Sequence, residues 1–213
     1  MMKKTSNSLL VLTTVICFLP MILSIVLYNK LPDEIAIHWN NAGEPDNFAP
    51  KALAAFGLPI LMAAINLVTH FSINTDPKKA NSSSILKLIG KWLVPIASVI
   101  LVPVTLFIAI GYDISIPMIC SAMVGIVIIA VGNYLPKCKQ SYTVGIRLPW
   151  TLNSENNWNK THRIAGYLWI IGGFALLINS FLNTGILYLT LTIAVLIMGV
   201  PYIYSYLLYK KGV

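Results

Sequence analysis

No Asp, Glu, Lys or Arg occurs between Ile164 and Tyr209, a stretch of 46 residues. As a single helix it would be about 70 Å long, more than twice the roughly 30 Å hydrocarbon core of a bilayer. The stretch must therefore fold back on itself, and the polar and small residues near its middle predict the turn. Those residues are Asn179, Ser180, Asn183, Thr184 and Gly185.

Four further segments lack charged residues and are long enough to cross a bilayer. They are residues 5–29, 52–75, 92–112 and 114–136. Only 10% of the 213 residues are charged, against about 25% in a typical soluble domain, and 57% are hydrophobic. This composition excludes a water-soluble globule. The sequence therefore predicts an all-α, polytopic integral membrane protein with six transmembrane helices.

The first segment also has features of a secretory signal, because Lys3 and Lys4 precede an apolar stretch. However, this stretch is longer than the usual signal core of about 7–15 residues, and no small-x-small cleavage site follows it. A retained helix is the favoured interpretation.

The distribution of Lys and Arg predicts the orientation, because these residues concentrate in cytoplasmic loops. Six spans place both termini on one side, which would carry 13 basic residues against two on the other. Both termini are therefore predicted to be cytoplasmic. The first side would hold Lys3, Lys4, Lys78, Lys79, Lys87, Lys91, Lys137, Lys139, Arg147, Lys160, Arg163, Lys210 and Lys211, and the other Lys30 and Lys51. The formal net charge of +8 follows from these loops and does not by itself indicate direct nucleic-acid binding.

The predicted extracytoplasmic loop, residues 30–51, has the pattern of an ordered element. The apolar side chains of Ile35, Ile37 and Trp39 alternate along it, which favours an extended segment. Residues 40–43 then read Asn-Asn-Ala-Gly, which is typical of a turn. His38 is the only histidine of this loop, so we expect it to form a hydrogen bond within the loop rather than to bind a metal.

The predicted cytoplasmic loop, residues 136–163, leads into the fifth span. Thr151 or Ser154 is placed to cap the helix that continues into this span. On that helix Trp158 and His162 share one face. A second shared face carries Glu155, Asn159 and Arg163. The aromatic and basic residues fit an interfacial anchor, a contact with anionic membrane lipids, or a docking face for a soluble partner.

Both loops carry motifs of a known family. Residues 31–40, Leu-Pro-Asp-Glu-Ile-Ala-Ile-His-Trp-Asn, with 42–46, Ala-Gly-Glu-Pro-Asp, resemble the DUF1648 element. Residues 145–152, Gly-Ile-Arg-Leu-Pro-Trp-Thr-Leu, followed by Trp158-x-x-Thr161-His162-Arg163 and Gly166, resemble the SdpI family signature. Many members have Thr where this chain has Leu148, which puts a polar contact there in doubt. The resemblance covers the whole chain and predicts a single membrane domain, residues 1–213.

This resemblance implies immunity to a secreted, SdpC-like peptide toxin. In members that signal, it also implies capture of a cytoplasmic SdpR-like repressor at the membrane. The candidate toxin-binding residues are His38, Trp39, Gly43, Glu44, Asp46 and Phe48. The candidate partner-binding residues are Gly145, Arg147, Pro149, Trp150, Thr151, Trp158, Thr161, His162, Arg163 and Gly166. No cofactor, metal or catalytic residue is predicted.

Two other classes of function fit this sequence less well. An integral-membrane enzyme needs a nucleophile or an acid–base pair, and His162, Glu155 and Arg163 are the only clustered candidates. A small transporter usually relies on ionisable residues inside the membrane, and among these spans only His70 qualifies. We therefore predict a protein that is not an enzyme, with a small transporter as the alternative.

Overall fold

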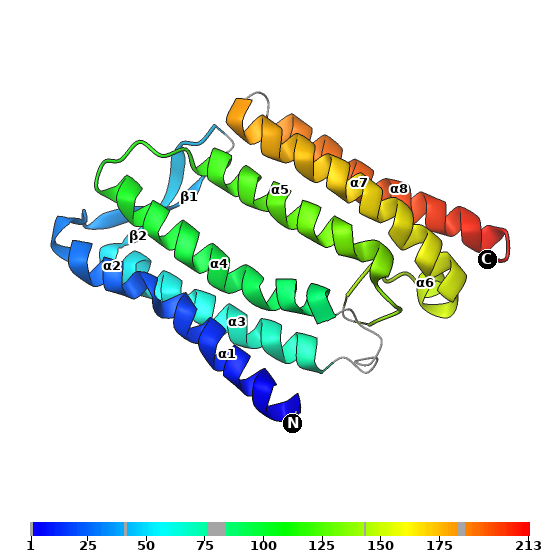
Figure 1. Ribbon diagram of the computed structural model, residues 1–213. Helices are drawn as coiled ribbons and strands as arrows, with labels where there is room; N and C mark the ends of the chain where they lie inside the picture. The colour runs from blue at the N-terminus through cyan, green and yellow to red at the C-terminus, as the bar shows by residue number, and fades with distance from the viewer. Residues whose placement is uncertain (1, 41, 76–83, 143, 183–185) are drawn as a thin grey trace. The chain divides into compact units, whose positions relative to one another are not determined.

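The computed structural model describes residues 2–40, 42–75, 84–142, 144–182 and 186–213 (Figure 1). The chain forms two compact units, which are described separately. Unit 1 comprises Met1–Ile73 and Gly90–Ile116, and unit 2 comprises Asn74–Ile89 and Pro117–Val213. Several residues named above, Asn41, Lys78, Lys79, Asn183, Thr184 and Gly185, lie outside the described residues.

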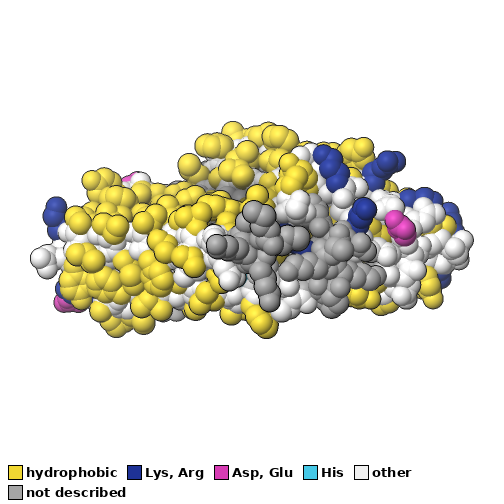
Figure 2. All heavy atoms as spheres, turned by 60° about the horizontal axis from the view of Figure 1, so that its bottom comes forward, with side chains coloured by type: hydrophobic (Ala, Val, Ile, Leu, Met, Phe, Trp, Pro, Cys, Tyr) yellow, Lys and Arg dark blue, Asp and Glu magenta, His cyan; other side chains and the backbone are white. Residues whose placement is uncertain are grey.

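Six helical runs in the described part of the chain are long and apolar enough to cross a membrane, which confirms the predicted fold class. They are Asn7–Lys30, Leu53–Asn74, Ser84–Ala109, Ile116–Lys137, Glu155–Leu182 and Leu187–Lys210. On the face seen in Figure 2, hydrophobic side chains form large exposed patches. Such a surface is stable in lipid rather than in water.

Helices α1 (Met2–Phe18) and α2 (Pro20–Leu27) of unit 1 form the first span. The break between them precedes Pro20, which has no backbone N–H to continue the helix. A 3₁₀ turn, Tyr28–Lys30, ends this span. The second span is a π-helical turn, Leu53–Gly57, followed by α3 (Leu58–Asn74). Ser24 Oγ donates a hydrogen bond to the carbonyl of Ala55, 2.6 Å away, and so ties the two spans together.

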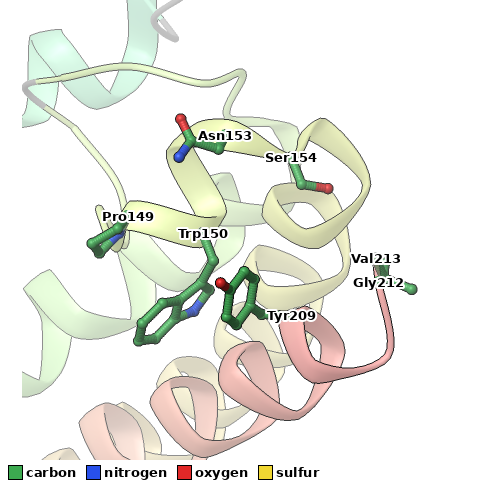
Figure 3. Close-up of a pocket in the computed structure, with 7 residues that line it drawn as sticks. All are labelled: Pro149, Trp150, Asn153, Ser154, Tyr209, Gly212 and Val213. Carbon is green, nitrogen blue, oxygen red and sulfur yellow. The ribbon is translucent and has the colours of Figure 1, made fainter.

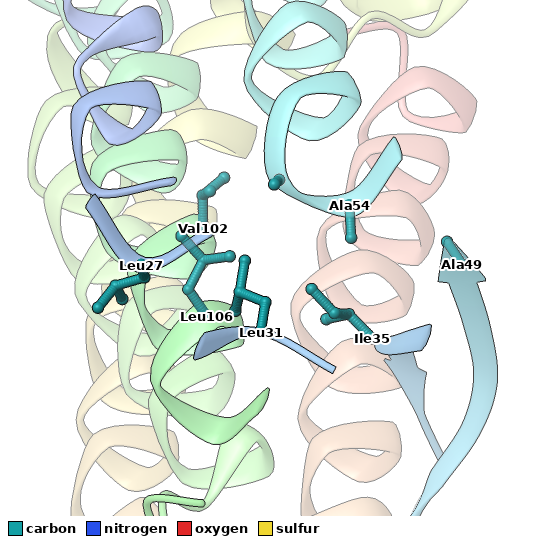
Figure 4. Packing of buried hydrophobic residues seen from close by; sticks show 8 residues of the cluster. Leu27, Leu31, Ile35, Ala49, Ala54, Val102 and Leu106 are labelled. Atoms are coloured by element: carbon teal, nitrogen blue, oxygen red, sulfur yellow. The ribbon is translucent and has the colours of Figure 1, made fainter. Parts of the chain in front are cut away.

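Between these spans lies an antiparallel β-hairpin of β1 (Glu34–Trp39) and β2 (Pro45–Pro50). The extended segment predicted at 35–39 is thus confirmed, whereas β2 was not predicted. A buried cluster anchors the hairpin to the helix ends of unit 1, because Ile35 and Ala49 point into it (Figure 4). The other members are Leu27, Leu31, Ala54, Ala55, Val102 and Leu106, of which the last two belong to α4 (Ser84–Ala109).

Unit 2 contains α5 (Ile116–Tyr134), a 3₁₀ turn (Leu135–Lys137), α6 (Pro149–Asn153), α7 (Glu155–Leu182) and α8 (Ile186–Lys210). Helices α7 and α8 pack along each other (Figure 1). The prediction that Asn179 and Ser180 form the turn between the last two spans is wrong, because α7 continues to Leu182. The Ser180 hydroxyl donates a hydrogen bond to the carbonyl of Leu177, so this polar group is satisfied inside the helix.

Glycines allow α5 and α7 to pack at backbone contact. A Cβ atom on Gly166 of α7 would lie 2.8 Å from the carbonyl oxygen of Gly132 on α5. The same contact recurs seven residues away on each helix, where a Cβ on Gly173 would lie 2.8 Å from the carbonyl oxygen of Gly125. Small residues at such positions let transmembrane helices approach closely. The predicted signature residue Gly166 therefore has a packing role.

Candidate functional site

The turn of the hairpin is closed by Asn40. Its side-chain Oδ1 accepts hydrogen bonds from the backbone N–H groups of Ala42 and Glu44, at 2.9 and 3.0 Å. The backbone N–H of Asn40 also donates to the carbonyl of Glu44, at 2.8 Å. Gly43 has a φ of +85°, a left-handed conformation that favours glycine. Residues 40, 42 and 43, the described part of the predicted turn, therefore have a turn conformation.

One hydrogen bond and one ion pair between side chains join the two strands and the two ends of the hairpin. His38 Nδ1 lies 2.5 Å from Asp46 Oδ1, which joins β1 to β2. This is the hydrogen bond within the loop that we expected for His38. Lys51 Nζ lies 3.3 Å from Asp33 Oδ1 and joins the two ends of the hairpin. The loop is therefore an ordered platform.

The structure brings all six candidate toxin-binding residues onto this hairpin. Four of them are exposed and two, Trp39 and Gly43, are half-buried. The exposed residues are His38, Glu44, Asp46 and Phe48. Phe48 keeps 51% of its surface accessible although it is a large apolar residue. The hairpin can thus offer carboxylates and an aromatic ring to a ligand that is both cationic and apolar.

In unit 2, the centre of the predicted signature is a stacked pair of buried rings. The Trp158 and His162 ring centroids are 3.9 Å apart, and both side chains are 0% exposed. Trp158 Nε1 donates a hydrogen bond to the carbonyl of Cys138, at 2.6 Å. The predicted shared face of these two residues is confirmed, and it points into the unit.

Both ring nitrogens of His162 bind backbone groups. Nε2 accepts a hydrogen bond from the backbone N–H of Ile146, at 2.9 Å. Nδ1 lies 2.8 Å from the carbonyl oxygen of Trp158, which can only accept. The ring is therefore neutral with its proton on Nδ1. His162 holds the loop after α5 against α7, and neither nitrogen is left for acid–base chemistry.

Gly145 is required where the loop crosses these rings. Its φ is +115°. A Cβ atom there would lie 2.6 Å from His162 Nε2 and 2.7 Å from the Trp158 ring. Any larger residue would meet both a strained backbone and an occupied space.

Of the two residues predicted as alternative caps of the helix that continues into the fifth span, Ser154 caps it and Thr151 has a different role. Ser154 Oγ accepts a hydrogen bond from the backbone N–H of Asn157, at 3.2 Å, and so caps α7. Thr151 Oγ1 accepts from the backbone N–H of Leu148 and donates to the carbonyl of Ile146, both at 2.8 Å, and so closes α6. Because Leu148 contributes its backbone, this contact does not need a polar side chain at that position.

Sequence reasoning missed a polar network that joins α6, α7 and α8. Trp150 Nε1 donates to Ser205 Oγ at 2.5 Å, and Ser205 Oγ donates to Asn157 Oδ1 at 2.9 Å. Thr161 Oγ1 also donates to Asn157 Oδ1, at 3.1 Å. Asn157 and Thr161 are four apart on one helix, which is a detectable signal. Ser205 has no such signal in the sequence.

Trp150 also lines a pocket of about 480 Å³ beside α6 and the end of α8 (Figure 3). Its ring stacks on that of Tyr209, with 5.8 Å between the centroids. The remaining lining residues are Pro149, Asn153, Ser154, Gly212 and Val213.

Burial divides the predicted partner-binding residues into two groups. Five are buried and shape the fold: Thr151, Trp158, Thr161, His162 and Gly166. Gly145 and Trp150 are half-buried, and Arg147, Pro149 and Arg163 are exposed. Glu155 and Asn159 are exposed on the same face of α7 as Arg163. Only the exposed and half-buried residues are accessible to a partner in this conformation.

Comparisons with known proteins match both loops. A model of the SdpI/YfhL protein family matches residues 137–205, and a model of DUF1648, a domain of unknown function, matches residues 15–63. Immunity protein SdpI of Bacillus subtilis (strain 168) is 30% identical to this chain over 202 residues, which are 94% of this chain and 96% of the relative. No solved structure matches this chain significantly. The six spans and this similarity together show that the chain is a multi-pass protein of the bacterial plasma membrane and belongs to the SdpI family.

Proposed function

We propose that this protein is an immunity protein that protects its bacterium from a secreted, SdpC-like peptide toxin. The observation that carries the proposal is the similarity to an immunity protein over nearly the full length of both chains. In the proposed topology both termini are cytoplasmic, the hairpin of unit 1 is extracytoplasmic, and residues 1–213 act as one membrane domain.

The hairpin supplies the proposed toxin contact. Its buried side is anchored on the helix ends of unit 1 through Ile35 and Ala49, so its exposed side is held in place. Glu44 and Asp46 would attract the cationic part of the peptide, and Phe48 would contact its apolar part. A peptide held there at the membrane surface would be kept from inserting or assembling.

Expression of the chain in a toxin-sensitive bacterium should raise the concentration of SdpC-like peptide needed for killing. The variant Glu44→Gln combined with Phe48→Ala should lower that concentration about tenfold, the loss expected for about 1.4 kcal/mol of binding free energy. The Gln side chain retains the oxygen that accepts from Asn40 Nδ2, so the turn should remain formed.

The matched control is Asp113→Asn, which removes an exposed carboxylate from another loop on the same proposed side. Unchanged killing with the unmodified chain, at verified membrane expression, would exclude immunity to that peptide. Full protection by the double variant would place toxin contact away from the hairpin.

We also propose that the exposed part of the signature captures an SdpR-like repressor. The supporting observation is that α7 has an exposed polar face, formed by Glu155, Asn159 and Arg163, and that Arg147 of the preceding loop is also exposed. Trp158 is fully buried, so it would act by supporting this surface rather than by contact. For toxin to control capture, it must bind one conformation of the protein better than another.

Arg163→Glu should abolish toxin-dependent recruitment of a fluorescent SdpR-like repressor to the membrane while leaving survival unchanged. The reason is that charge reversal repels a complementary acidic surface without touching the hairpin. Lys211→Glu, an exposed charge at the end of α8, is the control. Equal loss of recruitment and survival would argue against separate surfaces for the two partners.

A further inference from the structure

Two buried polar atoms of α3 have no hydrogen-bond partner among the described residues: Asn66 Oδ1 and His70 Nδ1. The side chains are 0% and 1% exposed. They are four residues apart, so they share one face of the helix. An unsatisfied buried polar atom costs about 1–3 kcal/mol, and buried polar groups in proteins are nearly always paired. The two atoms therefore indicate a ligand.

The threonines of α1 determine the orientation of the Asn66 amide. The Thr13 hydroxyl donates to the carbonyl of Leu9 at 2.9 Å, and the Thr14 hydroxyl donates to that of Leu10 at 2.8 Å. Both hydroxyl oxygens are then acceptors. Asn66 Nδ2 lies 3.1 Å from each and donates both of its hydrogens to them. The amide oxygen Oδ1 is thus left as an acceptor.

The same hydroxyl determines the tautomer of His70. Its Nε2 lies 3.1 Å from Thr13 Oγ1. Because the Thr13 hydrogen is already donated to a helix carbonyl, Nε2 must carry the proton and donate. The neutral ring then has a lone pair on Nδ1. The ligand must therefore donate two hydrogen bonds, one to Nδ1 and one to Asn66 Oδ1.

The buried position selects a neutral ligand. The side chains of Asn66 and His70 are almost fully buried within one apolar, membrane-spanning helix. An ion placed there would lose its hydration shell, which costs far more free energy than placing a neutral molecule. The smallest neutral species with two donor hydrogens is water.

We propose that a water molecule binds inside the membrane-spanning part of unit 1 and donates one hydrogen bond to His70 Nδ1 and one to Asn66 Oδ1. Buried waters commonly satisfy polar groups in this way. The site would link α1 and α3 through a hydrated polar network near the end of the second span. This proposal is independent of the immunity function.

Nitrogen-15 NMR of histidine-labelled protein in lipid nanodiscs tests the site in the unmodified chain. We expect His70 to show a protonated Nε2, a hydrogen-bonded Nδ1, and a cross-peak between its ring and water. His162 is the internal reference, because its proton lies on the opposite nitrogen and both of its partners are backbone groups. A bare Nδ1, a doubly protonated ring at neutral pH, or no contact with water would overturn the proposal.

Asn66→Leu removes one acceptor of the water and should shift the His70 Nδ1 resonance towards that of a nitrogen without a hydrogen bond. Thr69→Ala is the matched control, since Thr69 lies half-buried on α3 and its hydroxyl donates to the carbonyl of Ile65 in its own helix, at 2.8 Å. An unshifted His70 resonance in Asn66→Leu would contradict the shared water. If Asn66→Leu does not fold, the spectrum of the unmodified protein still decides.

Discussion

Gly145→Ala is expected to destabilise unit 2 by between about 2 and 6 kcal/mol. A left-handed backbone costs a non-glycine residue about 1–3 kcal/mol, and overpacking a filled site costs about 1–3 kcal/mol more. Both apply here, because φ is +115° and the new Cβ would lie 2.6 Å from His162 Nε2. The loop would have to leave the Trp158–His162 pair, which breaks the Ile146 N–H bond to His162.

Thermal unfolding in detergent can be followed at the thiol of Cys138, which is 2% exposed in the folded protein. A thiol-reactive dye reports its exposure once Cys17 and Cys120 are replaced by alanine. Gly212→Ala is the matched control, because Gly212 also has positive φ, +76°, but no atom lies within 4 Å of its added Cβ. Equal melting temperatures for Gly145→Ala and Gly212→Ala would show that the stability of unit 2 does not depend on the close packing of residue 145 against the Trp158 and His162 rings.

Trp158→Ala should destabilise unit 2 by about 3–5 kcal/mol, the usual cost of truncating a large buried aromatic side chain. The change removes the stacking with His162 and the hydrogen bond that Trp158 Nε1 donates to the carbonyl of Cys138. Trp158→Phe retains most of the packing and loses the hydrogen bond, so about 1–3 kcal/mol is expected. The same Cys138 assay measures both variants.

Tyr167→Ala on the same helix is the control, since Tyr167 is 64% exposed and should change stability little. A Trp158→Ala variant as stable as this control would refute the buried role of Trp158. If the variant folds normally but loses repressor recruitment, Trp158 would instead be a direct contact, as the sequence alone suggested.

The difference between Trp158 and Arg163 shows where sequence reasoning stops. Both residues belong to the same signature and lie five apart on one helix, yet one is 0% exposed and the other is exposed. Helical spacing assigns residues to faces but does not say which face meets the rest of the protein. That depends on the loop after α5, whose path is set by Gly145 and His162.

The hairpin was likewise only half predictable. In β1 the large apolar residues Ile35, Ile37 and Trp39 recur at every second position, and Ile35 and Ile37 pack against the helix ends of unit 1. In β2 only Ala49 is buried and both ends are proline, so the segment has no alternating pattern. Its strand conformation depends on pairing with β1, which no local pattern shows.

The sequence by itself determined the six spans and the two loops that carry the family motifs. Membrane spans depend on the length and polarity of contiguous segments, and these are local properties that the bilayer imposes. Only the tertiary structure decided that Thr13 meets His70 and that Trp150 meets Ser205, pairs separated by 57 and 55 residues. Such contacts depend on how helices pack, which is set by the mutual fit of many side chains rather than by any one segment.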